Sequence, residues 1–173
     1  MSNRSYVKMN LDDLRRLQAL ALADRTDFFA RRPSYLPLAD RLIAVTLSQG
    51  AALHYVDGVN GIKDLDVWTF YAGLPGLTFP QRRYTAVDFG DPKFGPAFDK
   101  EGYVGRRVDL MGRSLLVDYP ADPVAVLHKY LSEQRTPSAT YLAQKAVVLL
   151  EPLARLGEVI WYKGQPYVSG HTG

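Results

Sequence analysis

The amino-acid sequence predicts a mixed α+β (or α/β) fold in which a small mixed β-sheet is flanked by helices. The prediction depends on three observations: a capped amphipathic segment at 11–32, an alternating run of strand-forming residues at 64–71, and helical segments interspersed with strand-like ones. Interspersed segments of these two kinds are typical of helices packed on a sheet. The length of 173 residues suits a single domain, 1–173, whose core we expect at 42–118.

The first third of the chain predicts a long helix, a strand and a short helix. Asn10 can cap the N-terminal helix at 11–32 because its side chain accepts a hydrogen bond from a first-turn amide, and a proline follows the helix. After a linker or short helix at 34–41, the apolar run at 42–47 predicts a buried strand. The next segment, 48–55, predicts one short helix.

The middle of the chain has the strongest strand character. The segment 64–71 alternates between polar and apolar residues and is rich in Val, Trp, Phe and Tyr. Further strands are expected at 82–89 and 106–117, with a bulge at Gly112 in the second. Between them, the Gly- and Pro-rich segment 90–105 predicts a long loop, and loops of this length are often functional. Four aromatic residues are candidates for a lid over a bound base: Phe89, Phe94, Phe98 and Tyr103.

The last third predicts two C-terminal helices within 122–150 and a tail. The first helix is expected at 122–134, since Asp122 precedes a proline at the first helical position. The second is expected at 137–150, and 158–168 predicts a terminal hairpin or extended tail.

Composition excludes several classes of protein and of site. The chain has no cysteine and three histidines, so disulfides, thiolate zinc sites and cysteine nucleophiles are excluded, and carboxylates remain as the plentiful metal ligands. The formal net charge of +3 is too small by itself to indicate extensive nucleic-acid binding. The apolar runs are too short to span a membrane and the first ten residues are polar, so we expect a cytoplasmic protein without a membrane partner.

Paired aspartates on the predicted strand 64–71 are the most informative motif. Gly50-Ala51 is followed after twelve residues by Asp64-Leu65-Asp66. Side chains at i and i+2 of a strand lie on the same face, about 7 Å apart. Their oxygens can converge on one or two divalent cations, and such a cation stabilises a transferring phosphoryl group.

A third carboxylate is required to complete such a site and to help deprotonate an attacking hydroxyl. A neighbouring strand should supply it. Asp109 is the best candidate because it stands alone between apolar residues in a predicted strand, and Asp88 is the alternative.

These residues resemble the signature of the nucleotidyltransferase-fold superfamily, including a minimal, uncharacterised bacterial group with a similar Gly-Ile-Lys-Asp-Leu-Asp-Val-Trp stretch. The signature is an apolar strand, a Gly-Gly or Gly-Ser turn, an Asp-x-Asp strand and a later third Asp. Gly50-Ala51 matches the turn, Asp64 and Asp66 match the metal pair, and Asp109 matches the third carboxylate.

The resemblance implies a magnesium-dependent transferase, which moves a nucleoside monophosphate from a nucleoside triphosphate to an acceptor. It implies Mg²⁺ at Asp64, Asp66 and Asp109, with Asp109 also catalytic. The candidate nucleotide- or phosphate-binding residues are Gly50, Ala51, Lys63, Arg113 and Lys145. The acceptor stays open between a small molecule, a protein and RNA, and the oligomeric state also stays open.

Two other classes of function remain. The second turn position is Ala51 rather than Gly or Ser, and Lys63 precedes the pair, which favours an inactive member that binds a nucleotide or a partner protein. A metal-dependent nuclease is the weaker alternative, since paired aspartates also serve hydrolysis. A patch of arginines would suit an RNA partner if it forms: Arg82, Arg83, Arg106, Arg107 and Arg113.

Overall fold

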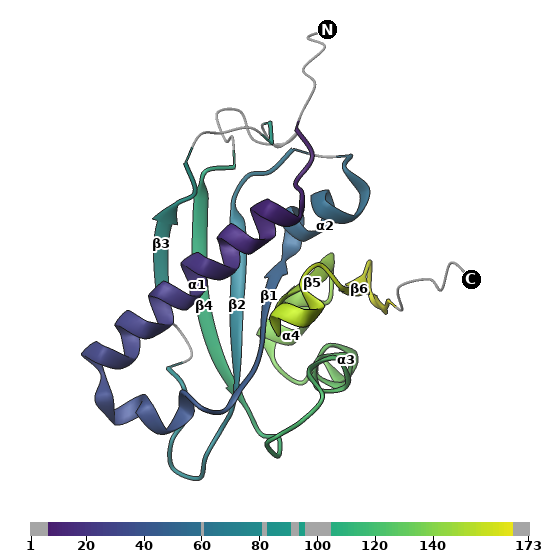
Figure 1. Ribbon diagram of the computed structural model, residues 1–173. Helices are drawn as coiled ribbons and strands as arrows, with labels where there is room; N and C mark the ends of the chain where they lie inside the picture. The colour runs from purple at the N-terminus through teal and green to yellow at the C-terminus, as the bar shows by residue number, and fades with distance from the viewer. Residues whose placement is uncertain (1–6, 60, 81–82, 91–93, 96–104, 168–173) are drawn as a thin grey trace, which may run out of the picture.

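A mixed seven-stranded sheet with helices on both faces forms the α+β architecture of the chain (Figure 1). The computed structural model describes residues 7–59, 61–80, 83–90, 94–95 and 105–167. The strand order is β3-β4-β2-β1-β5-β6-β7. β2 and β4 are parallel, and the other neighbouring pairs are antiparallel. Within the described residues, no helix is long and apolar enough to cross a membrane.

The elements follow the chain in the predicted alternation of helix and strand. In the first half they are α1 (Leu11–Arg31), a 3-10 helix (Pro33–Leu38), β1 (Leu42–Ser48), α2 (Gln49–Asp57) and β2 (Leu65–Ala72). In the second half they are β3 (Tyr84–Asp88), β4 (Arg107–Leu115), α3 (Pro123–Glu133), α4 (Pro137–Leu142), β5 (Ala146–Glu151), a 3-10 helix (Leu153–Arg155), β6 (Val159–Tyr162) and β7 (Gln165–Pro166).

Apolar cores lie on both faces of the sheet. α1 crosses one face diagonally and packs Leu14 and Leu17 against alternate residues of the central strands, such as Val67 (Figure 1). The other face packs its alternate residues, such as Phe70, against α3 and α4. Because β2 and β5 are covered on both sides, nearly all their residues are buried.

The helix predicted at 137–150 is wrong in its second half. α4 ends at Leu142, and Ala146–Glu151 is the strand β5, paired with β1 and β6. A strand buried on both faces is a continuous apolar run, which periodicity does not distinguish from a buried helix. Lys145 consequently lies in the turn before β5 rather than on a helix.

The bulge predicted at Gly112 is also absent. β4 pairs with β2 without interruption from Val108 to Leu115, and Gly112 lies opposite Thr69. The glycine is required for packing instead, because a Cβ at this position would lie 2.3 Å from Cε1 of Phe79.

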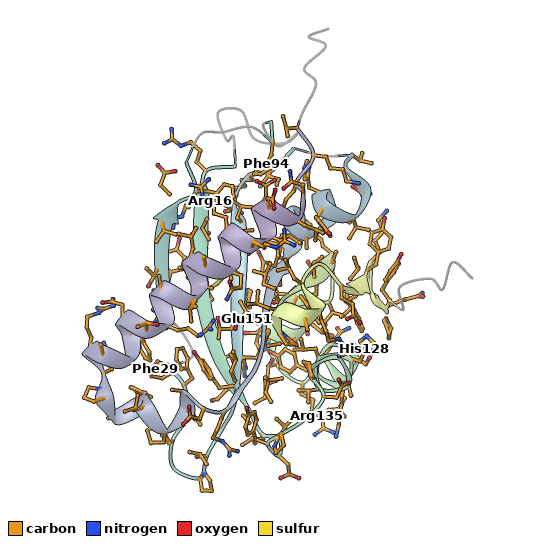
Figure 2. The ribbon with its side chains drawn as sticks, in the orientation of Figure 1. Arg16, Phe29, Phe94, His128, Arg135 and Glu151 are labelled. Carbon is orange, nitrogen blue, oxygen red and sulfur yellow. The ribbon has the colours of Figure 1, made fainter. Side chains whose placement is uncertain are left out.

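Two ion pairs are buried beneath the C-terminal half of α1. Arg25 Nη1 lies 2.6 Å from Oε2 of Glu151, which is labelled in Figure 2, and the two side chains are only 11% and 15% exposed. Arg83, which precedes β3, pairs with Asp24 in a similarly buried contact. Between these pairs, burial raises the pKa of the Tyr71 phenol. Charges beneath α1 therefore fix the helix against strands from both halves of the sheet.

Candidate metal and nucleotide site

Three aspartates converge at one end of the sheet, as the sequence predicts. Asp66 on β2 and Asp109 on β4 are opposite each other in the parallel register, and Asp64 immediately precedes β2. Asp64, Asp66 and Asp109 each offer a carboxylate oxygen, and these oxygens lie within 4.8 Å of one another. Asp66 and Asp109 are buried, at 8% and 7% exposure. The three carboxylates are therefore close enough to share one cation.

The start of α2 adjoins these carboxylates. Ser48, the last residue of β1, is opposite Asp66 in the antiparallel register, so α2 begins at the same end of the sheet. Among the described residues, the N-cap Ser48 makes no side-chain cap hydrogen bond to the first amides of α2, which include those of Gly50 and Ala51. The left-handed residue of the turn is Gln49, with φ of 61°, a conformation that is uncommon for a non-glycine residue.

Two donors hold one oxygen of Asp109. The Tyr84 hydroxyl on β3 and the Arg107 Nε on β4 each donate to Oδ1 at 2.6 Å. The guanidinium of Arg107 also lies over the ring of Tyr84, 5.1 Å from its centroid. Because both donors use Oδ1, neither of them occupies the second oxygen of Asp109.

Burial, followed by the crowding of negative charge, dominates the electrostatics of the three aspartates. The pKa of Asp66 is raised from 3.8 to about 7, first by burial, then by the charges of Asp64 and Asp109 and by a hydrogen bond with Asp109. Burial, and then the charge of Asp109, raises the pKa of Asp64 as well. Without a bound cation, the negative charge of the cluster costs folding free energy. Such unfavourable charge is typical of functional carboxylate sites.

Two predicted phosphate-binding lysines lie near the carboxylates. Lys63 and Lys145 both lower the pKa of Asp64, against the larger effect of burial. A Cβ built on Gly50 would lie 4.0 Å from the Lys145 Nζ, so this ammonium is close to the start of α2. The structure thus brings together Gly50, Ala51, Lys63 and Lys145 with the aspartates, although Lys145 arrives from a turn.

Arg113 and Asp88 lie apart from this cluster. Arg113 follows Asp109 by four residues on the same face of β4, a separation of about 13 Å along the strand. Its Nη1 donates to Ser138 Oγ at 3.1 Å. Asp88 is exposed on β3 and pairs with Arg106. Of the two candidates for the third carboxylate, the structure therefore selects Asp109.

Among the members that the structure describes, neither the arginine patch nor the aromatic lid forms as proposed. Arg83 is buried beneath α1, whereas Arg113 contacts α4 on the opposite face of the sheet. Phe89 and Phe94 are core residues, 1% and 0% exposed, beside the N-terminal half of α1 (Figure 2). Arg82, Phe98 and Tyr103 lie outside the described residues.

Sequence reasoning misses three residues at the site. These are Gln49, Tyr84 and Tyr141. Gln49 Nε2 donates to the Tyr141 carbonyl at 2.6 Å, which ties the start of α2 to α4. Burial, followed by the charges of Asp66, Asp64 and Asp109, raises the pKa of the Tyr141 phenol, so Tyr141 faces the carboxylates. No spacing in the sequence indicates these contacts, because each depends on how separate elements pack.

The donor set suits a hard divalent cation. It consists of carboxylate oxygens only, which are the ligands that Mg²⁺ prefers. Octahedral ligands at about 2.1 Å from Mg²⁺ place neighbouring oxygens about 3 Å apart, so small side-chain movements would close the present spacing.

In comparisons with known proteins, no family model, no curated protein and no solved structure matches the chain. The residues of the site are therefore what indicates the function of the chain.

Proposed function

We propose that the chain is a magnesium-dependent nucleotidyltransferase of the cytoplasm. It would transfer a nucleoside monophosphate from a nucleoside triphosphate to an acceptor hydroxyl or phosphate. The observation that carries the proposal is the convergence of Asp64, Asp66 and Asp109 beside the uncapped start of α2. The carboxylates suit a cation and the free amides suit the phosphates that accompany it.

Each group has a distinct role in this proposal. Asp64, Asp66 and Asp109 hold Mg²⁺, which when bound neutralises charge on the phosphates. The acceptor oxygen attacks the α-phosphorus, the bond from that phosphorus to the bridging oxygen of the β-phosphate breaks, and pyrophosphate leaves. Asp109 takes the acceptor proton, and the hydrogen bonds that its Oδ1 accepts from Tyr84 and Arg107 hold its carboxylate in place.

The surrounding cations support a polyphosphate ligand. Lys63 and Lys145 are close enough to lower the pKa of Asp64. With a divalent cation on the three aspartates, the local charge becomes positive and complements a triphosphate. The backbone amide of the partly exposed Gly50 at the start of α2 adds an oriented donor to the same region, with Ala51 buried behind it.

A nucleotide-binding protein without turnover is the second candidate. Its support is the absence of an available hydroxyl in the turn. The Ala51 side chain is fully buried in the core, and the buried Ser48 hydroxyl lies 3.2 Å from that of Thr46. A triphosphate would then be held by amides and lysines alone, with less control over its orientation.

Calorimetric titration with ATP, GTP, CTP and UTP, with and without Mg²⁺, tests nucleotide binding. The variant is the isosteric double substitution Asp64→Asn/Asp66→Asn, and Asp118→Asn is the control because Asp118 is exposed and outside the cluster. We expect Mg²⁺-dependent binding of at least one triphosphate by the wild type and the control, and its loss in the double variant.

Turnover is measured with the same proteins and an α-labelled triphosphate. Release of pyrophosphate with label on an acceptor supports the transferase. Binding without pyrophosphate release supports the second candidate. Absence of binding of any triphosphate contradicts both, and metal-dependent cleavage of RNA or DNA without a triphosphate would indicate a nuclease instead.

A further inference from the structure

A pocket lies on the α3 face, at the end of the sheet away from the carboxylates. It lies between the C-terminal half of β4 and α3 and encloses about 520 Å³, a size typical of small-molecule sites. Its lining residues include Arg113, about 13 Å along β4 from Asp109, and none of the three aspartates. The pocket is therefore separate from the carboxylate site.

The wall of this pocket is mainly apolar. Leu115 and Val117 line it from β4 and the segment that follows, and Val126 and the ring of Tyr130 line it from α3. Such a wall suits the aliphatic or aromatic body of a ligand, since burial of apolar surface stabilises the complex.

The polar part of the pocket is cationic. Arg113, Lys129 and Arg135 line it together with one carboxylate, that of Glu133. The Glu133 carboxylate already pairs with two of these cations, because its oxygens lie 3.1 Å from Arg135 Nε and 3.9 Å from Lys129 Nζ. Within the described residues, no carboxylate pairs with Arg113, which leaves its charge for a ligand.

Arg113 is partly buried and incompletely bonded. Its Nη1 donates to Ser138 and its guanidinium lies 5.9 Å from the centroid of the Tyr130 ring. Its Nε is buried and has no hydrogen-bond partner among the described residues. A buried donor without a partner is costly, and a guanidinium matches the geometry of an anionic oxygen pair.

We propose that this pocket binds a small amphipathic anion, with its acidic group on Arg113 and its apolar body between β4 and α3. The site is independent of the nucleotidyltransferase proposal, since it shares no residue with the carboxylate cluster. A carboxylate, a sulfonate and a phosphate monoester share the required chemistry.

Two dyes of nearly the same shape test this proposal. 1-Anilinonaphthalene-8-sulfonate carries an acidic group on an apolar body, and N-phenyl-1-naphthylamine is the same body without the acid. We expect one sulfonate dye per native wild-type chain. Arg113→Gln should weaken its binding about tenfold or more while changing binding of the neutral dye less than about twofold. Val126→Trp should remove binding of both dyes by filling the pocket.

Arg31→Gln is the matched control, because Arg31 is an exposed arginine on α1 that pairs with Asp27. It should leave both affinities unchanged, and near-ultraviolet circular dichroism verifies that every variant is folded. If Arg113→Gln is unstable, amide chemical-shift mapping of the wild type replaces it, and the shifts should centre on Ala125, Tyr130 and Thr136. The proposal would be overturned if the wild type fails to bind the sulfonate dye, or if Arg113→Gln loses affinity for both dyes equally. It would also be overturned if Val126→Trp leaves dye binding unaffected, or if the chemical-shift changes centre elsewhere.

Discussion

Replacement of Asp66 by asparagine should stabilise the chain in the absence of metal, and the gain should grow with pH. The substitution keeps the shape of the side chain and removes its charge from the crowded cluster. The pKa of Asp66 is raised from 3.8 to about 7, so the folded state holds a proton that the unfolded state releases at a lower pH. Stability is therefore lost as the pH rises through this window, and the neutral asparagine avoids the loss.

The size of the effect follows from the two pKa values. At about 1.4 kcal/mol per pH unit, the full cost of the ionised Asp66 is about 4 kcal/mol, reached near pH 8. At pH 5 the cost is about 1–2 kcal/mol, because only the unfolded state is extensively ionised there. The advantage of Asp66→Asn should thus increase by about 2–3 kcal/mol between pH 5 and pH 8. For a chain of this length that corresponds to about 5–10 °C in Tm.

Thermal and urea unfolding at both pH values, with EDTA present, measure this difference. Asp118→Asn should show no pH-dependent gain, since Asp118 lies outside the cluster. The electrostatic reasoning would be refuted if Asp66→Asn increases the free energy of unfolding equally at pH 5 and pH 8, or if it lowers the free energy of unfolding at pH 8. With Mg²⁺ in place of EDTA, the wild type should recover stability at pH 8 and the variant should not.

Three further substitutions probe the contacts around the site and the core. Tyr84→Phe should weaken Mn²⁺ binding about tenfold, because Asp109 loses one of the two donors on Oδ1, and a titration followed by electron paramagnetic resonance measures it. Gly112→Ala should lower the free energy of unfolding by about 1–3 kcal/mol in urea, because the new methyl would lie 2.3 Å from Phe79 Cε1. Glu151→Gln should cost about 3 kcal/mol in thermal unfolding, because it leaves a buried guanidinium of α1 without its ion pair.

Each of these substitutions has a matched control. Tyr119→Phe, on a loop, should leave Mn²⁺ affinity unchanged. Gly50→Ala should keep stability, since its methyl would meet only the Lys145 Nζ at 4.0 Å. Asp27→Asn should cost less than about 1 kcal/mol because its ion pair with Arg31 is exposed. Equal effects in a variant and its control would contradict the corresponding contact.

The sequence predicts most of the fold because local signals agree with the packing. Asn10 caps α1 as predicted, within a capping box completed by Asp13, and α3 begins at Pro123 as expected. The failure at β5 has a physical cause. Its residues Ala146–Glu151 are buried on both faces, so they lack the alternation that distinguishes a half-exposed strand.

The carboxylate cluster was predictable, whereas its surroundings were not. The spacing of Asp64 and Asp66 places them together by strand geometry alone, and an isolated aspartate in a neighbouring strand completes the set. Tyr84 and Tyr141 reach the cluster through strand order and through packing of α4, which no local pattern encodes. The position of Arg113 likewise depends on which way β4 runs.

Because β2 and β4 pair in parallel, the distance between the carboxylates of the site does not depend on how many residues connect the two strands. Asp66 and Asp109 are register partners, so backbone hydrogen bonding sets their separation. The connection between the strands contributes Tyr84 through β3 but does not enter the spacing of the two carboxylates. Evolution could lengthen or shorten that connection to alter what reaches the site while the metal-binding pair keeps its spacing.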